Sequence, residues 1–121
     1  MVIRFKDTVI DSIEDTETRR LKLIKISSKN EGALLTLELP DALCGSMSEG
    51  DNVSIVIDSK EIVKGHESKL YLEGSIFKKS TKEGLEVTGS IGGLKLVLNL
   101  AKATANQESS FDSDKFYLVI K

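Results

Sequence analysis

Four basic side chains early in the chain could bind a polyanion: Arg19, Arg20, Lys22 and Lys25. Proteins that bind single-stranded nucleic acid combine such a basic face, which neutralises phosphates, with aromatic side chains that stack on bases. No aromatic residue occurs between Arg19 and Asp58, so the stacking side chains are missing here. We therefore interpret the four residues as a solvated basic strand or one that pairs with an acidic protein partner, and keep single-stranded nucleic acid as the alternative ligand.

Acidic side chains gather in two places, where they could bind a hard cation or act as a paired acid and base. They are Asp11, Glu14, Asp15 and Glu17 in the first group, and Asp112 and Asp114 in the second. The first group lacks the glycine and the ligand spacing of a calcium loop. We interpret both groups as solvated turns and predict no metal site, with a small carboxylate hydrolase kept as a third reading of the chain.

The chain has a single histidine, His66, and a single cysteine, Cys44. A general base needs an orienting partner and a nucleophile nearby, and the polar stretch around His66 indicates neither. The neighbours of Cys44, Leu43 and Gly45, supply no charge that would lower the pKa of the thiol. We predict a surface histidine, a small buried cysteine, no catalytic residues and no cofactor.

The sequence Gly89-Ser-Ile-Gly-Gly93 resembles a phosphate-binding loop only superficially. Such a loop ends in Gly-Lys-Ser/Thr and opens a helix. Here the next residues, Leu94-Lys-Leu-Val-Leu98, alternate as in a strand. Because glycine readily adopts turn conformations, we predict a bend between two paired strands.

The bulk composition predicts one globular domain over residues 1–121. The net charge is −2 and the isoelectric point about 5.5, which disfavours independent binding to nucleic acid. No segment approaches the length of apolar residues that spans a membrane, and residues 1–7 lack the core of a signal peptide. A single cysteine is typical of a reducing compartment, so we expect a cytoplasmic protein with no membrane partner.

Period-2 alternation of apolar residues dominates the chain and predicts an all-β fold. We expect seven clear strands at 19–27, 33–39, 52–58, 69–78, 85–91, 94–100 and 116–120, preceded by short extended segments at 2–5 and 8–13, with one helical turn in 41–50. The apolar pattern changes phase between Leu23 and Ile24, which predicts a β-bulge or burial on both faces. The pattern favours a sandwich or a single antiparallel barrel of about seven to eight short strands. Glycines at 74, 89, 92 and 93 would allow sharp bends.

The last strand, Phe116-Tyr-Leu-Val-Ile120, is apolar on both faces. Phe116, Leu118 and Ile120 would fill the barrel, whereas Tyr117 and Val119 would point outward. Apolar residues on the outside of a sheet need cover. Either the loop at 101–114 or a partner protein could supply it.

Three stretches resemble the subunit-8 family of multisubunit DNA-directed RNA polymerases, in particular its archaeal form. Ser90-Ile-Gly-Gly-Leu-Lys-Leu-Val-Leu98 is similar to the family's Ser-Phe-Gly-Gly-Leu-Leu-Met-x-Leu, and Phe116-Tyr-Leu-Val-Ile-Lys121 to its closing Tyr-Leu-Leu-Ile-Arg-Lys. The stretch from Leu35-Thr-Leu-Glu-Leu39 to residues 50–57 is similar to a family strand, its loop and the next strand. The resemblance covers about residues 19–121. It departs from the family at Ile91 and Lys95, and its loop at 59–68 is shorter than in eukaryotic members.

The resemblance implies an OB-like barrel without catalytic residues that packs on the outside of the polymerase against the largest subunit. Magnesium and polymerisation chemistry would belong to the large subunits, and DNA and RNA would be met only through the complex. No small-molecule substrate is implied. The glycine bend and the two-faced last strand suggest the contact residues, namely Gly92, Gly93, Leu94, Lys95, Tyr117 and Val119.

Overall fold

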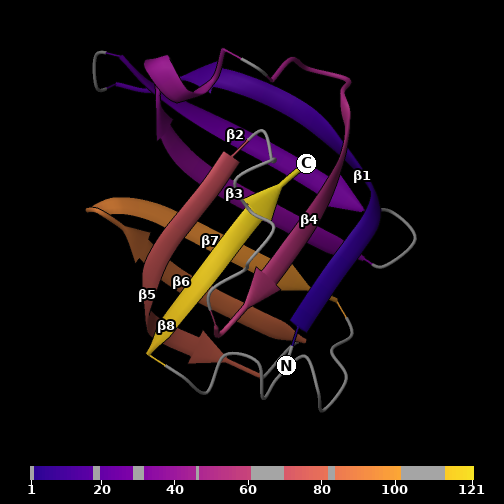
Figure 1. Cartoon of the computed structure of the whole chain (residues 1–121), viewed down its shortest axis with the longest axis vertical. Helices are drawn as coiled ribbons and strands as arrows, with labels where there is room; N and C mark the ends of the chain where they lie inside the picture. The colour runs from indigo at the N-terminus through magenta and orange to yellow at the C-terminus, as the bar shows by residue number, and fades with distance from the viewer. Residues whose placement is uncertain are drawn as a thin grey trace.

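Eight antiparallel strands close into a barrel in the computed structural model, which describes residues 2–17, 20–28, 32–45, 47–60, 70–81, 84–101 and 114–121 (Figure 1). The strands are β1 (Val2–Asp15), β2 (Leu21–Ser28), β3 (Ala33–Pro40), β4 (Asn52–Asp58), β5 (Leu70–Ser80), β6 (Leu85–Ile91), β7 (Leu94–Leu100) and β8 (Lys115–Ile120). A short 3-10 helix, η1 (Asp41–Leu43), follows β3, as the sequence suggested. The predicted all-β, OB-like antiparallel barrel is therefore confirmed.

The barrel consists of two similar halves, although the sequence shows no internal repeat. Around the ring the strands run β1-β2-β3-β7-β6-β5-β8-β4. In each half, three strands follow one another and the fourth returns beside the first, which is the Greek-key order. The halves, β4-β1-β2-β3 and β8-β5-β6-β7, meet where β3 pairs with β7 and where β4 pairs with β8.

Two long strands turn the corners of the barrel, because each pairs with different neighbours along its length. β1 pairs with β4 through Val9 and with β2 from Val9 onward, and β5 pairs first with β8 and then with β6. The register of β1 shifts between Phe5 and Thr8 and again between Ile10 and Ser12. The prediction of two separate extended segments at 2–5 and 8–13 was wrong, because these bulges bend one strand without ending it.

The phase change at Leu23 arises from burial on both faces of β2. The register of β2 against β3 is regular from Leu21 to Ser28, so the bulge lies on the facing strand β1. Ile24 and Ile26 are buried inside the barrel, while Leu21 and Leu23 are half-buried on the outside. Arg20 precedes the strand in a turn, at φ 63°, and was wrongly placed within it.

The interior is filled by alternate residues of every strand, such as Leu35, Leu37 and Leu39 of β3. The largest inward side chain of β8, Phe116, packs against two glycines. A Cβ atom built on Gly74 or on Gly89 would lie 2.5 Å or 2.8 Å from the Phe116 ring. These two glycines therefore make room for an aromatic ring at a corner of the barrel.

Several predictions concern residues outside the described ranges. They include Arg19, His66, Asp112 and most of the loops predicted at 59–68 and 101–114.

Candidate functional site

The Gly92–Gly93 pair forms the two-residue turn of the β6–β7 hairpin, between the paired residues Ile91 and Leu94. Both glycines have positive φ, 57° and 92°, as a type I′ turn requires. The Gly93 N–H donates to the Ser90 hydroxyl at 3.2 Å. The turn leads into a strand and not a helix, so the prediction of a bend in place of a phosphate loop is confirmed.

This turn presents bare backbone on the surface. Both glycines are exposed, and no atom lies within 4 Å of a Cβ atom built on either one. The glycines therefore serve the turn geometry and leave open space around it, which would let another molecule approach the backbone closely.

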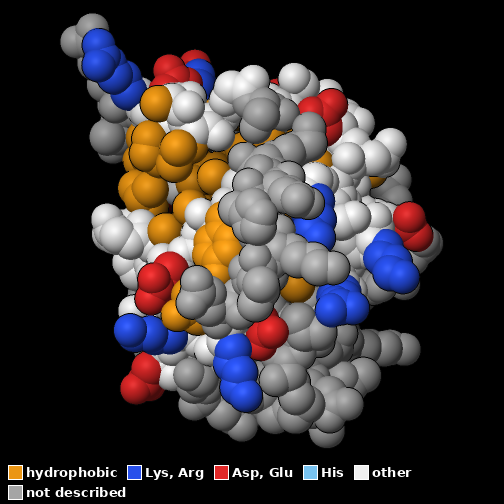
Figure 2. Space-filling model, in the orientation of Figure 1, with side chains coloured by type: hydrophobic (Ala, Val, Ile, Leu, Met, Phe, Trp, Pro, Cys, Tyr) orange, Lys and Arg blue, Asp and Glu red, His pale blue; other side chains and the backbone are white. Residues whose placement is uncertain are grey.

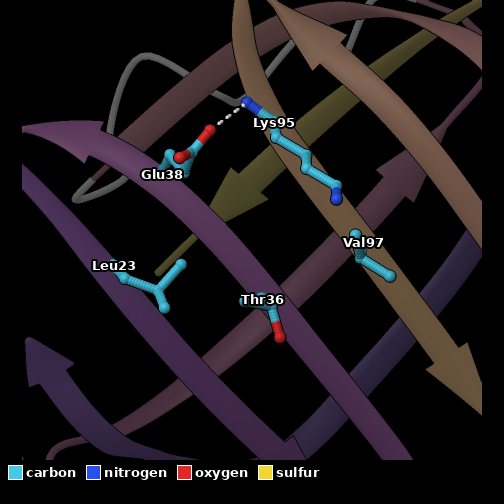
Figure 3. Close-up of a pocket in the computed structure, with 5 residues that line it drawn as sticks. All are labelled: Leu23, Thr36, Glu38, Lys95 and Val97. Atoms are coloured by element: carbon cyan, nitrogen blue, oxygen red, sulfur yellow. Dashed lines mark hydrogen bonds between the residues drawn. The ribbon is translucent and has the colours of Figure 1, made fainter. Parts of the chain in front are cut away.

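The residues after the turn lie where the β3–β7 ladder ends. Its last strand pair is Leu37 with Leu96. One position further on, the Lys95 backbone N–H donates to a carboxylate oxygen of Glu38 at 2.8 Å (Figure 3). Leu94 is half-buried and Lys95 is exposed. A hollow of about 250 Å³ lies beside this contact and is lined by Leu23, Thr36, Glu38, Lys95 and Val97.

The outward residues of β8 differ in exposure. Tyr117 is half-buried, and its ring meets that of Tyr71 edge-on at a centroid distance of 6.3 Å. Val119 lies between Val56 of β4 and Tyr71 of β5 and is completely buried, yet it does not belong to the core cluster. The chain itself therefore covers Val119, which corrects its assignment to a partner surface.

The predicted contact residues do not form one continuous surface. In the ring, β6 and β5 lie between β7, which carries Leu94 and Lys95, and β8, which carries Tyr117. Figure 2 shows hydrophobic side chains gathered on one part of the face that includes β8, and charged side chains scattered elsewhere on it. The turn and Tyr117 are therefore separate candidates for contact.

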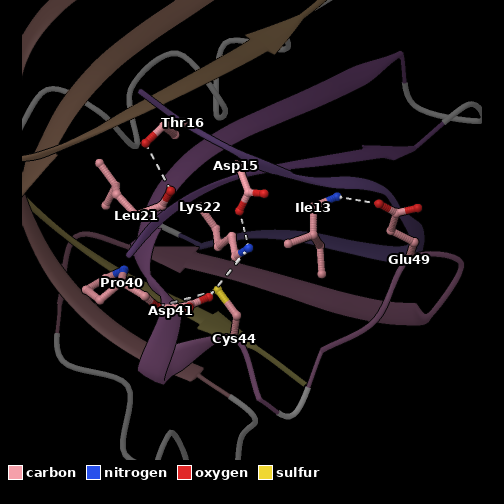
Figure 4. A network of polar contacts seen from close by, with 9 residues as sticks. All are labelled: Ile13, Asp15, Thr16, Leu21, Lys22, Pro40, Asp41, Cys44 and Glu49. Carbon is pink, nitrogen blue, oxygen red and sulfur yellow. Dashed lines mark hydrogen bonds and ion pairs between the residues drawn. The ribbon is translucent and has the colours of Figure 1, made fainter. Parts of the chain in front are cut away.

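Two residues of the predicted basic face, Lys22 and Lys25, have acidic neighbours on other elements, whereas Arg20 is exposed. Lys22 forms an ion pair with Asp15 on β1 and lies 3.7 Å from Asp41 (Figure 4). Its hydrogen bond to Asp15 raises the pKa of Lys22, against a smaller opposing effect of burial. Lys25 lies 3.9 Å from Glu14. Sequence spacing alone did not reveal these pairs, because they join different strands.

Cys44 lies beside this network. Its thiol donates to the Pro40 carbonyl at 3.5 Å and packs against the core. Burial raises the pKa of the Cys44 thiol, and the nearby Asp41 charge raises it further. The thiol is therefore protonated at neutral pH and is a poor nucleophile. Among the described residues, no group of three or more histidine, cysteine, aspartate or glutamate side chains could hold a metal ion.

Sequence reasoning missed the hollow on β2, β3 and β7. The phase change at Leu23 was the only sequence signal of this hollow, because the change places a leucine on the outer face of β2. The role of Glu38 had no local signal, because its partner Lys95 lies in a distant part of the chain.

Comparison with known proteins adds no family assignment: no family model matches the sequence, and no curated protein matches it. Within the described ranges, no helix is long and apolar enough to cross a membrane.

Proposed function

We propose that this chain is a non-catalytic accessory subunit of an archaeal-type DNA-directed RNA polymerase. It would contribute to transcription in the cytoplasm by packing against the largest subunit and stabilising the assembly. Nucleotide addition and its magnesium ions would belong to the large subunits.

One observation carries the proposal: the motif behind the polymerase resemblance forms a surface hairpin. Gly92, Gly93 and Lys95 of this motif are exposed, and the space around the turn is open. The apolar motif residues Ile91, Leu96 and Leu98 are buried in the core, whereas the exposed residues are available for contact. A bare turn held between two paired strands suits close contact with another protein, because its backbone conformation is set before binding.

The charge pattern supports contact with protein over direct contact with nucleic acid. Nucleic-acid affinity depends on lysines and arginines that are free to neutralise phosphates. Lys22 and Lys25 are instead paired with Asp15, Asp41 and Glu14.

Affinity purification of the tagged full chain at moderate salt tests the proposal directly. We expect the two large polymerase subunits to be recovered in stoichiometric amounts, as identified by mass spectrometry. Recovery of the chain alone, or with nucleic acid only, would contradict the proposal and favour Arg19, Arg20, Lys22 and Lys25 as the functional face.

A further inference from the structure

The hollow on the outer face of β2, β3 and β7 has an apolar floor. Leu23 of β2 and Val97 of β7 are half-buried there, on either side of Thr36 of β3. Small-molecule sites usually enclose about 300–1,000 Å³. A hollow of about 250 Å³ that lies open on a sheet therefore suits a side chain or two of another protein better than a cofactor.

The rim of the hollow holds a backbone donor that a partner could use. The Lys95 N–H points toward β3, but a side-chain oxygen of Glu38 accepts it at 2.8 Å, in place of a strand carbonyl. A carboxylate side chain can rotate away, whereas a backbone carbonyl in a paired strand is fixed. An incoming backbone carbonyl could therefore replace Glu38 at this position without breaking a pair of the ladder.

The rim also carries two opposite charges, the Glu38 carboxylate and the Lys95 ammonium, which do not form an ion pair with each other. None of the ion pairs among the described residues involves Lys95, in contrast to Lys22, Lys25 and Lys115. Figure 3 shows the Lys95 side chain extending away from the Glu38 carboxylate and alongside Val97. One free ammonium above an apolar floor complements a single carboxylate beside an aliphatic group. It complements a polyphosphate poorly, because one ammonium can neutralise only one of several neighbouring phosphate charges.

We infer that this hollow is a docking site for an extended segment of a partner protein that carries an aliphatic side chain next to a carboxylate. The aliphatic group lies against Leu23 and Val97, and the carboxylate pairs with Lys95. A backbone carbonyl of the segment accepts the Lys95 N–H once Glu38 turns away. This inference rests on the proposed function, in which the segment belongs to a large polymerase subunit, and it extends the candidate contact from the Gly92–Gly93 turn along β7.

Two variants of the tagged full chain test the site, each with a matched control. Lys95→Glu reverses the free charge, and Val97→Asp places a charge in the apolar floor. Lys6→Glu and Val9→Asp make the same changes on β1, which β2 and β3 separate from β7 in the ring. We expect each test variant to lower recovery of the large subunits by about tenfold or more, as loss of a central contact does. The controls should recover wild-type amounts, and all four should melt near the wild-type temperature.

The outcomes separate the two proposals. Recovery of the large subunits by wild-type and both folded test variants alike would overturn the docking site and leave the proposed function standing. If wild-type chain recovers no polymerase subunit, the proposed function fails. A photoreactive benzoylphenylalanine at Asn99, the next outward residue after Val97 on β7, then decides the site. A crosslink to a protein segment with adjoining aliphatic and acidic residues, lost in Lys95→Glu, supports it, while a crosslink to nucleic acid or to nothing overturns it.

Discussion

At the scale of single residues, glycines in this barrel meet two different needs. Gly74 and Gly89 supply space for the Phe116 ring at ordinary φ values, whereas Gly92 and Gly93 supply positive φ in an open turn. Substitutions at Gly74 and Gly89 should therefore lower the stability of the fold. Substitutions at Gly92 and Gly93 should instead affect contact with another molecule.

Replacing Gly74 with alanine should destabilise the fold by about 1–3 kcal/mol, because overpacking a filled interior forces neighbours to move. The new Cβ atom would lie 2.5 Å from the Phe116 ring and 2.7 Å from the Ser90 carbonyl oxygen. Gly45→Ala is the matched control, since no atom lies within 4 Å of its Cβ position. Chemical denaturation of both variants measures the difference, and equal stability of the two would contradict this account of Gly74.

The turn glycines allow folding and contact to be separated. Gly92→Asn should keep wild-type stability, because asparagine tolerates φ near the 57° found there. It should nevertheless reduce co-purification of the large polymerase subunits, since its side chain occupies the open space. Gly93→Val should reduce co-purification as well, and its φ of 92° should add a strain cost of about 1–3 kcal/mol. Normal incorporation of both variants, once folded, would remove the turn from the contact surface.

We expect the folded protein to be less stable in alkaline solution because of two titratable groups near η1, the Cys44 thiol and the Lys22 ammonium. The folded-state pKa values of Cys44 and Lys22 are raised above their ordinary values of 9.0 and 10.5. The folded protein thus holds these protons more tightly than the unfolded chain. Their contribution is complete below pH 9.0 for Cys44 and below pH 10.5 for Lys22, and it is lost as pH rises through each folded-state pKa.

Denaturation of wild-type and Cys44→Ala protein between pH 8 and 11 measures how much the Cys44 thiol contributes to the change of unfolding free energy with pH. We expect the stability of Cys44→Ala to fall less steeply with pH just above 9.0. Parallel curves for the two proteins over that range would show that the thiol contributes nothing.

At the scale of the strands, the β3–β7 ladder depends on a side chain at its open end. Glu38 satisfies the Lys95 N–H there, since the strands pair only as far as Leu37 and Leu96. A substitution at this end of the β3–β7 ladder can therefore weaken the pairing of the two strands without changing a core residue.

Glu38→Ala should cost about 1 kcal/mol of stability, the usual net worth of such a hydrogen bond. It should also speed hydrogen exchange at the Lys95 amide, while exchange at Val97 changes little. Glu86→Ala removes an exposed glutamate from the neighbouring strand β6 and is the control. If the Lys95 amide hydrogen exchanges equally fast in the wild type and in Glu38→Ala, the Glu38 carboxylate does not stabilise this end of the β3–β7 ladder in solution.

At the scale of the whole molecule, the two Greek-key halves depend on each other. By itself, each half leaves one edge of each of its two outer strands unpaired, and these edges pair where β3 meets β7 and where β4 meets β8. β8 is central to this closure, because it pairs with β5 on one side and with β4 on the other. Unpaired strand edges are aggregation-prone, so neither half is expected to be a stable barrel alone.

We therefore expect one cooperative unfolding transition for the chain. Tyr71 and Tyr117 lie on β5 and β8 and report on the second half through tyrosine fluorescence, while far-ultraviolet circular dichroism reports on all strands. The two signals should change at the same denaturant concentration. Separate midpoints would indicate halves that unfold independently.

The sequence by itself determined most strand positions and the β6–β7 turn. Alternation of apolar residues indicates which side of a strand is buried, and the two adjacent glycines indicate a turn with positive φ. Both patterns are local, so they can be interpreted without knowing which strands are neighbours. The resemblance of Ser90–Leu98 and Phe116–Lys121 to the polymerase family is also a property of the sequence alone, and the function proposed from it stays a prediction.

Only the tertiary structure decided the strand order, the continuity of β1 and the partners of the charged side chains. A β-bulge is defined only relative to a facing strand, so the interruption at residues 6–7 did not show whether the strand bends or ends there. The pairing of Lys22 with Asp15 and of Glu38 with the Lys95 amide likewise joins different strands. Closure of the ring sets these contacts, because it fixes which distant strands become neighbours and in which register.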